Sequence, residues 1–293
     1  MPISDHFIQN RLLKELSTFG IGGPAKYFVE VKQISDMQKI LSYCNENLVP
    51  YFILGKGSNS LFDDRGFDGL VISNKIDFLH KSEDLCRHVG AGYSFSLLGN
   101  QTARQGLSGL EFASGIPGSI GGAIFMNAGA NGRETCESLI EVDYVTPEGE
   151  LVHLKKSELE FRYRYSSFQK MKGAIVGAKF VLTPSGSARE KQLKIIDYRK
   201  KTQPYNAKSA GCVFRNPDCG AAGALIDQSQ LKGASIGGAQ VSSVHANFVI
   251  NTGNATALEV LELIKLISKT VHEKTGVELE SEVRLIPYKM DSG

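Results

Sequence analysis

The sequence lacks several features that would place the protein in a large class at once. No apolar run approaches the roughly 18–20 residues that a membrane-spanning helix needs, and residues 1–9 contain no basic stretch followed by an apolar segment, as a signal peptide would. No Lys/Arg run of the kind that binds a nucleic-acid backbone is present, and the net charge is only +2. These absences predict a cytoplasmic protein that binds neither membranes nor nucleic acid.

Cysteine is scarce, and the pattern of its positions excludes two common uses. No two of the five cysteines form a CxxC pair; they are Cys44, Cys86, Cys136, Cys212 and Cys219. The odd number and the wide spacing predict reduced thiols rather than a disulfide framework. The histidines are equally scattered, at His6, His80, His88, His153, His245 and His272. Because zinc sites need closer ligand spacing, the sequence predicts no metal site.

The composition is that of an ordinary globular protein long enough for more than one domain. Of its 293 residues, 42% are hydrophobic and 22% are charged. No low-complexity linker or long internal repeat interrupts the chain. We expect three parts: an α/β lobe at residues 1–72, a strand-rich lobe at 73–184 and a C-terminal part at 185–293.

Periodicity and turn signals predict the main elements. Strands are expected at residues 26–31, 49–54, 69–72, 85–90, 139–146, 150–154, 174–182, 212–214, 240–244, 248–251 and 277–286. The turn at 147–149 should join two of them as a hairpin. Helices are expected at 35–45, from Ser94, at 190–202 and after the strand at 248–251. The apolar face of that last helix holds Val260, Ile264, Ile267 and Val271, and Gly276 should end it.

The first of two glycine-rich segments, residues 55–61 (GKGSNSL), directly follows a predicted buried strand. Glycine permits positive φ angles and close approach of the backbone to a ligand. Successive N–H groups in such a turn can form an anion-binding nest, and Ser58, Asn59 and Ser60 add side-chain donors. The spacing differs from a Walker A loop. The segment is a candidate pyrophosphate site, and a tight surface turn is the alternative.

The second glycine-rich segment, residues 109–129, is too apolar for a flexible linker and too rich in glycine for an ordinary core helix. Ser119 can begin a helix whose N-terminal N–H groups face an anion. The small residues would let the backbone pack against a flat ring or a diphosphate. Because GxGxxG is absent, the segment is not a Rossmann fingerprint. Close backbone packing without a ligand is the alternative. Two such segments suit a dinucleotide better than a mononucleotide.

Motifs along nearly the whole chain resemble the UDP-N-acetylenolpyruvoylglucosamine reductase (MurB) family. Besides the two glycine-rich segments, they are residues 17–25 (STFGIGGPA), 161–168 (FRYRYSSF), 209–217 (SAGCVFRNP), 231–233 (LKG) and 279–284 (LESEVR). The resemblance implies an α+β chain with a PCMH/vanillyl-alcohol-oxidase-type FAD-binding fold. In that fold two α/β subdomains are followed by a C-terminal α/β substrate-binding domain. The short last third resembles the subclass that lacks an extra substrate-covering loop.

The resemblance also implies the reaction and its cofactors. NADPH would reduce non-covalently bound FAD, and the hydride would then pass to the enolpyruvyl double bond of a UDP-sugar. The product would be UDP-N-acetylmuramate, a precursor of peptidoglycan. The family uses one pocket alternately for NADPH and substrate. We expect a small-molecule UDP-sugar as the partner, and a monomer.

Three residues match the family's catalytic positions. Arg164 can hold a carboxylate with two hydrogen bonds, although a surface arginine is the alternative. Glu282 can be neutral in a closed site and donate to the reaction intermediate, although a solvated strand residue is the alternative. We favour Glu282 over Glu280, because Glu282 is the second glutamate in the Glu-x-Glu-Val-Arg ending of the motif. Cys212 stands where the family commonly has a serine as proton donor; a thiol, with a pKa of about 8.5, is the stronger acid. A small buried cysteine is the alternative.

The segments and the resemblance together supply the residues expected to bind ligands. Those for FAD are Gly55, Lys56, Gly57, Ser58, Asn59, Ser60, Leu61, Ser114, Gly115, Ile116, Pro117, Gly118, Gly121, Gly122, Ala123 and Asn127. Those for the UDP-sugar are Tyr163, Asn216 and Lys232. Asn216 resembles a contact to the diphosphate, and Lys232 can neutralise phosphate or be an ordinary exposed lysine.

Two other functions remain open at this point. One is a different flavoprotein of the same fold, such as an oxidase of a small alcohol or sugar. An oxidase needs a base and access for oxygen, so an acid placed to protonate carbon argues against it. The other is a non-catalytic nucleotide-binding or scaffold protein. Neither glycine-rich segment alone decides between them.

Overall fold

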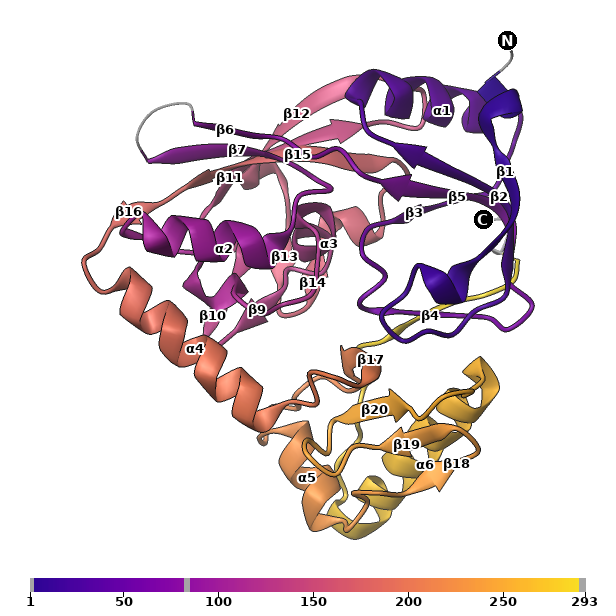
Figure 1. Ribbon diagram of the computed structural model, residues 1–293, viewed down its shortest axis with the longest axis vertical. Helices are drawn as coiled ribbons and strands as arrows, with labels where there is room; N and C mark the ends of the chain where they lie inside the picture. The colour runs from indigo at the N-terminus through magenta and orange to yellow at the C-terminus, as the bar shows by residue number, and fades with distance from the viewer. Residues whose placement is uncertain (1–2, 82–84, 290–293) are drawn as a thin grey trace. The chain divides into compact units, whose positions relative to one another are not determined.

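The computed structural model describes residues 3–81 and 85–289, and its contacts divide the chain into two compact units. Unit 1 comprises the chain up to residue 8, residues 28–56 and residues 70–199; unit 2 comprises residues 9–27, residues 57–69 and the chain from residue 200. Figure 1 colours the chain from its N-terminus to its C-terminus. The three-part division expected from the sequence stays a prediction.

An antiparallel sheet is the centre of unit 1 (Figure 1). Its strand order is β12 (Leu151–Lys155), β11 (Leu139–Val145), β15 (Ala174–Val181), β7 (Cys86–Gly90) and β6 (Leu79–Lys81). The turn at 147–149 joins β11 and β12 in the predicted hairpin, with Val145 opposite Leu151. One face of the sheet is apolar and contributes Val89, Val142 and Ala178 to the core of this unit.

Two of the four helices of unit 1 begin at the serines from which the sequence predicts them to start. They are α1 (Ile34–Glu46), α2 (Phe95–Arg104), α3 (Ile120–Phe125) and α4 (Ala188–Thr202), whose last three residues belong to unit 2. Ser94 Oγ accepts the Leu97 N–H at the start of α2, and Ser119 Oγ accepts the Gly122 N–H at the start of α3. Both predicted helix starts are confirmed. Phe95, Leu98, Ile120 and Ile124 pack against the apolar face of the sheet.

Shorter elements complete the N-terminal two thirds of the chain. A further sheet has the order β1 (Ile8–Leu12), β2 (Pro24–Val31), β5 (Phe67–Asn74), β3 (Tyr51–Leu54), and the unit boundary falls within β2 and β5. Paired two-residue strands in unit 1 are β9 (Gly129–Ala130) with β10 (Arg133–Glu134), β13 (Phe161–Arg162) with β14 (Tyr165–Ser166), and β8 (Leu107–Ser108) with β16 (Thr183–Pro184). Short 3-10 helices span Ile3–His6, Leu13–Glu15, Glu111–Ala113, Thr135–Glu137, Lys156–Glu158 and Ser167–Gln169.

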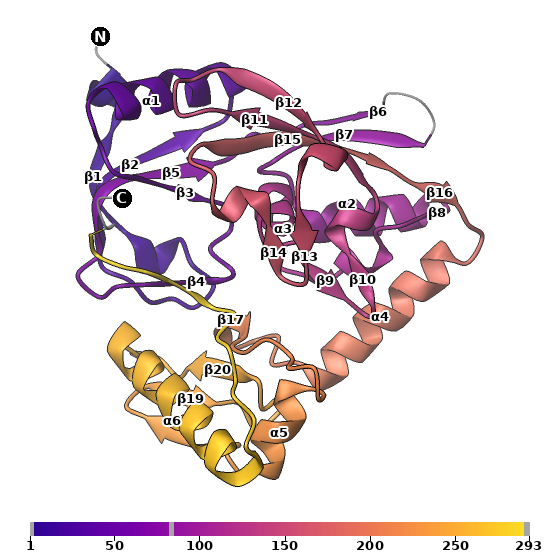
Figure 2. The ribbon, with the colours of Figure 1, turned by 180° about the vertical axis from the view of Figure 1, so that it is seen from behind.

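Unit 2 contains an antiparallel sheet packed against helix α6 (Figure 2). The strand order is β17 (Lys208–Cys212), β20 (Phe248–Asn251), β19 (Ala239–Val241) and β18 (Ser235–Ile236). The helices are α5 (Ala222–Gln228) and α6 (Ala257–Thr275). Two further strands, β4 (Ser60–Phe62) and β21 (Arg284–Ile286), pair in parallel. No helix among the described residues is both long and apolar enough to cross a membrane.

Helix α6 has the apolar face and the C-terminal end that the sequence predicts, and the structure adds its N-terminal cap. Thr256 and Glu259 form a reciprocal capping box at its N-terminus. Its C-terminus stops at Gly276, whose φ of 72° is the left-handed conformation that glycine adopts without strain. The predicted apolar face is buried at Val260, Ile267 and Val271, together with Leu263, and Ile264 packs at the edge of the same core.

Three strands in unit 2 differ from the prediction, and one of them, expected at 240–244, is the shorter β19 at 239–241. The strand expected at 212–214 lies at 208–212, and a register irregularity between Ser209 and Cys212, where Gly211 has a φ of 82°, interrupts its pairing with β20. The strand expected at 277–286 is regular only at 284–286. The alternating apolar residues Val277 and Leu279 do pack into the core, but residue 281 makes only an isolated bridge to Phe214. Alternation therefore correctly indicated burial, and without a continuous partner strand it did not produce a ladder.

Candidate active site

The two glycine-rich segments meet within unit 1. A Cβ added to Gly55 would lie 2.4 Å from Ser119 Oγ, and nothing but the Ser119 side chain lies within 4 Å of that position. Such a distance is far below van der Waals contact, so only glycine fits at residue 55 while Ser119 keeps its place. The sequence predicts both segments as parts of one ligand site, and the structure brings this pair of residues together although 64 positions separate them in the numbering of the chain.

Helix α3 begins inside the second segment, as expected, but it is only six residues long. Its Gly122 N–H donates to Ser119 Oγ, and its Gly121 N–H donates to the Ala91 carbonyl. These two amides are therefore already bound by protein groups. An anion at this segment would be held by other groups of the loop, where Gly115 has a φ of 85°.

Ser114 gives a direct test of whether the segment fits the implied FAD. Its side chain is fully buried, and its Oγ has no hydrogen-bond partner among the described residues. A buried hydroxyl without a partner costs free energy, so such a group calls for a further partner, such as a bound water or a ligand. Together with the close backbone approach at Gly55, this hydroxyl fits a polar cofactor that lies along the glycine-rich backbone. The residues present therefore fit FAD.

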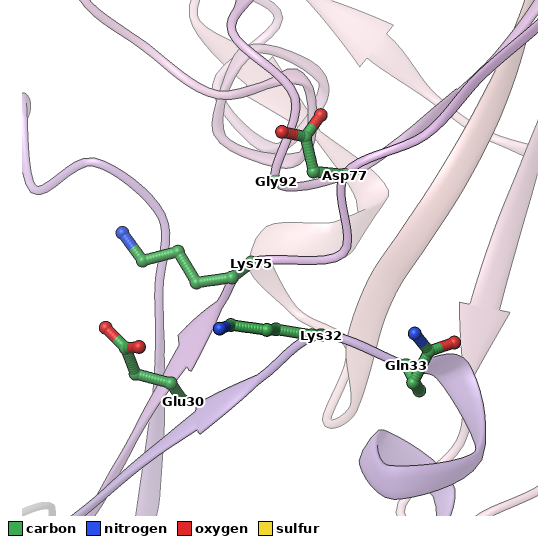
Figure 3. Close-up of a pocket in the computed structure, with 6 residues that line it drawn as sticks. All are labelled: Glu30, Lys32, Gln33, Lys75, Asp77 and Gly92. Carbon is green, nitrogen blue, oxygen red and sulfur yellow. The ribbon is translucent and has the colours of Figure 1, made fainter.

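A pocket of about 400 Å³ lies beside these segments in unit 1, and its polar lining was not predicted. It is lined by Glu30, Lys32, Gln33, Lys75, Asp77 and Gly92. Figure 3 shows the side chains of Glu30, Lys32 and Lys75 pointing toward the same side. Its residues come from three separate stretches of the chain. The local signal in the sequence that could have indicated the pocket is the Gly90-Ala-Gly92 turn.

Lys56 links this pocket to the first glycine-rich segment. Burial lowers the pKa of Lys56 below its usual range, and the charge of nearby Lys75 lowers it further, while Asp77 opposes the shift. Another residue of the pocket lining, Gly92, directly follows Ala91, whose carbonyl accepts the Gly121 N–H of the second segment. The lining carries two lysines and two carboxylates, Glu30 and Asp77, so its formal charges balance, and Lys56 adds a positive charge at the first segment.

Arg164 lies at the tip of a small hairpin, between β13 and β14. Its φ is 57°, an uncommon left-handed conformation for a residue with a side chain. Gln169 Nε2 holds it there by donating to the Arg164 carbonyl at 3.0 Å. The guanidinium lies 5.0 Å from the ring of Tyr163, which is 43% exposed. A Cβ at Gly129 would lie 3.3 Å from Arg164 Nη1, so the lack of a side chain there leaves space for the guanidinium.

The same hairpin is tied to the end of the second glycine-rich segment. Ser166 Oγ donates to the Phe125 carbonyl at 2.7 Å, and Asn127 Nδ2 donates to the Arg162 carbonyl at 3.0 Å. Asn127 is fully buried and also binds Glu134 and the Cys136 N–H. Its side chain thus joins the predicted cofactor segment to the arginine hairpin, which gives it a structural role besides the predicted contact to FAD.

Cys212 and Glu282 lie close together within unit 2. Cys212 ends β17, and the next residue, Val213, accepts the Glu282 N–H at 2.7 Å. Asn59 Nδ2 donates to the Glu282 carbonyl at 3.1 Å. The neighbouring Glu280 instead forms an exposed ion pair with Arg215 at 2.9 Å. This arrangement supports the choice of Glu282 over Glu280. Arg164 belongs to the other unit, so its convergence with Cys212 and Glu282 stays a prediction.

The predicted substrate residues of unit 2 gather around α5. Asn216 Oδ1 accepts the Ala222 N–H at 3.0 Å, and Lys232 Nζ lies 2.7 Å from Asp227 Oδ2. One further residue, His245, was missed by the sequence analysis. Burial lowers its pKa below the usual range, and the charge of Lys232 lowers it further. No spacing marks this histidine in the sequence, because it joins the group only through folding.

Comparison with known proteins identifies the class and then the family. A profile described as "FAD binding domain" matches residues 25–155, and one described as "UDP-N-acetylenolpyruvoylglucosamine reductase, C-terminal domain" matches residues 203–286. The chain therefore has the fold of an FAD-binding flavoprotein, as predicted.

Proteins similar to this chain along nearly its full length identify the family. The UDP-N-acetylenolpyruvoylglucosamine reductase of Protochlamydia amoebophila is 69% identical over 293 residues, 100% of this chain and 98% of that one. The Chlamydia muridarum protein of the same name is 49% identical over 281 residues, 96% of this chain and 95% of that one. The crystal structure of the Thermus caldophilus enzyme (MurB) has a TM-score of 0.81 and 35% identity, and the match covers 96% of this chain and 100% of that one. The chain belongs to the UDP-N-acetylenolpyruvoylglucosamine reductase family, which confirms the predicted resemblance.

Proposed function

We propose that this protein reduces UDP-N-acetyl-3-O-(1-carboxyvinyl)-glucosamine to UDP-N-acetylmuramate, with NADPH as reductant and FAD as cofactor, in peptidoglycan precursor synthesis. The observation that carries the proposal is the 69% identity over the whole chain to a relative named for this reduction. The buried, orphaned Ser114 hydroxyl and the close approach of Gly55 to Ser119 support a cofactor at the glycine-rich segments. Bound FAD supplies hydride transfer from NADPH to the enolpyruvyl double bond.

The substrate chemistry defines what the protein residues must do. Hydride addition at C3 pushes electrons toward the substrate carboxylate, so negative charge develops on its oxygens. Arg164 is suited to hold that carboxylate, because its planar guanidinium stays charged and can donate two hydrogen bonds. The hydrogen bond from Gln169 holds the backbone from which the guanidinium extends, and electrostatic stabilisation is effective when the charged group is positioned before the substrate arrives.

Protonation at C2 then needs a positioned acid. The Cys212 thiol is the proposed donor, and the proton leaves sulfur as the C2–H bond forms. Glu282, hydrogen-bonded through its backbone to Val213, is proposed to stabilise the enolate-like intermediate as a neutral acid. Asn216, Lys232 and Tyr163 are proposed to bind the UDP-sugar. We further propose that the protein acts in the cytoplasm as a monomer.

A product analysis tests the function. The holoenzyme is incubated with NADPH and the enolpyruvyl UDP-sugar, and the sugar is examined by mass spectrometry while NADPH oxidation is followed by absorbance. The proposal predicts one NADPH consumed for each sugar that gains two hydrogen atoms. Oxidation of NADPH with an unchanged sugar would contradict it. Turnover of a small alcohol or free sugar in oxygen would instead favour an oxidase, which the comparisons do not favour.

A further inference from the structure

His245 lies near Asn216 and Lys232, the two residues of unit 2 that are predicted to contact the diphosphate. A Cβ at Gly223, in the first turn of α5, would lie 3.2 Å from His245 Cε1, so the ring sits directly over that turn. The same turn begins at Ala222, whose N–H binds Asn216. On the other side, the charge of Lys232 is close enough to lower the pKa of the imidazole. An amide, an ammonium and an imidazole from three separate loops thus surround one short helix.

The hydrogen bonding of His245 fixes which nitrogen carries the proton. Its Nδ1 accepts the Asn247 N–H at 3.2 Å, so in the neutral ring the proton is on Nε2. Because the pKa is lowered, mainly by burial, the ring is neutral at physiological pH. The ring also packs on Phe248, with centroids 4.9 Å apart. The result is one oriented N–H donor on a half-buried ring.

The turn that carries His245 is rigidly joined to the strand of Cys212. Ser242 Oγ accepts the N–H groups of Val244 and His245, which holds the turn in shape. Asn247 exchanges two side-chain hydrogen bonds with the backbone of Phe214, at 2.8 and 2.9 Å. A ligand held by His245 is therefore held in a fixed relation to the segment that follows Cys212.

Asn216, Lys232 and His245 together carry little net positive charge, so a diphosphate bound among them would be recognised partly by neutral hydrogen-bond donors. The positive charge of Lys232 is partly balanced by Asp227, 2.7 Å away, so the ammonium alone offers limited attraction. We propose that His245 binds a phosphate oxygen of the UDP moiety through its Nε2–H, beside Asn216 and Lys232. This inference rests on the proposed function, because it presumes a UDP-sugar substrate.

Binding of UDP to the oxidised holoenzyme, measured by isothermal titration calorimetry, tests the inference. His245→Leu removes the donor, and His245→Gln keeps a neutral N–H donor of similar reach. Loss of one hydrogen bond to a charged phosphate should weaken UDP binding about 10- to 150-fold in the leucine variant. The glutamine variant should bind within about threefold of wild type. His272→Leu, at an exposed position on α6, is the matched control and should bind UDP as wild type does.

Steady-state kinetics add a measurement that a purely structural role would not move. The KM for the UDP-sugar should rise in the leucine variant while kcat at saturation stays near that of wild type, because a diphosphate contact is made equally in ground and transition states. FAD content and the unfolding midpoint show that the variant is folded. The inference is overturned if the leucine variant binds UDP as tightly as wild type, or if glutamine is no better than leucine. Failure of the wild type itself to bind UDP would instead refute the proposed function.

Discussion

Gly55→Ala tests the contact on which the cofactor site is built. The new Cβ would lie 2.4 Å from Ser119 Oγ, so one of the two groups has to move. The least costly response is rotation of the Ser119 hydroxyl, which gives up the N-cap bond to Gly122. Loss of such a cap costs about 0.5–2 kcal/mol, and a backbone shift in a well-packed region costs about 1–3 kcal/mol. Because rotation is the less costly route, we expect Gly55→Ala to lower the free energy of unfolding by roughly 0.5–2 kcal/mol.

A double-mutant cycle identifies the cause of that loss. With Ser119→Ala the nearest remaining atom, Ser119 Cβ, is 3.6 Å from the new methyl group, an ordinary contact. In that background Gly55→Ala should cost less than about 0.5 kcal/mol, so the two changes couple strongly. Gly186→Ala is the matched control, because nothing lies within 4 Å of its added Cβ. Urea unfolding gives the free energies, and flavin fluorescence gives the FAD affinity, which should fall with Gly55→Ala. Additive effects of the two substitutions would refute the reasoning.

Three further predictions concern the proposed chemistry and the stability of unit 2. Cys212→Ala should leave reduction of the flavin by NADPH intact but slow its reoxidation by the UDP-sugar by about 10²–10⁴-fold, while Cys212→Ser keeps measurable turnover; stopped-flow absorbance separates the two steps, and normal reoxidation in the alanine variant would exclude the thiol as donor. Glu282→Gln should lower kcat by a similar factor, whereas Glu280→Gln, which only loses an exposed ion pair with Arg215, should leave kcat nearly unchanged; the reverse result would mean that the wrong glutamate was chosen. The pKa of Glu259 is held below its usual range because the carboxylate accepts the N–H groups of Thr256 and Gly238, so its stabilisation is present at neutral pH and is lost as pH falls through the folded-state pKa; the stability difference between wild type and Glu259→Gln should shrink on acidification, and a difference independent of pH would contradict this.

Local signals in the sequence predicted the parts of the fold that depend on neighbouring residues. Ser94 and Ser119 start helices because a serine hydroxyl satisfies an N–H group of the first turn. Gly276 ends α6 because it can adopt a positive φ. The hairpin of β11 and β12 follows from a proline-glycine turn between two apolar runs.

Features that depend on pairing between distant segments could not be predicted in this way. The histidines look scattered in the sequence, yet His88 and His153 both bind the buried carboxylate of Asp143, at 2.5 and 2.7 Å. The three residues lie on three different strands. Gly177 lies between Asp143 and His88, and a Cβ added to Gly177 would lie 2.4 Å from Asp143 Oδ2. The lack of a side chain there leaves space for the Asp143 carboxylate. Only the register of the sheet determines that these residues meet.

The residues of the candidate site also fall into those that local sequence predicts and those that only the fold brings together. The glycine-rich segments were recognisable because close backbone approach requires glycine, which is visible in the sequence itself. The polar pocket lined by Lys32 and Lys75 and the proximity of His245 to Lys232 were missed, because each brings together residues on separate segments that only the fold places near one another. The preference for Glu282 over Glu280 rested on a motif, and the ion pair of Glu280 with Arg215 now gives it a physical reason.

An anaerobic titration of the purified holoenzyme tests the central claim most directly. NADPH is added until the flavin absorbance is bleached, and the enolpyruvyl UDP-sugar is then added without oxygen. The proposed function predicts that one equivalent of the sugar restores the oxidised flavin spectrum. If the flavin stays reduced until oxygen enters, the protein does not pass hydride to this substrate and the proposed function is wrong.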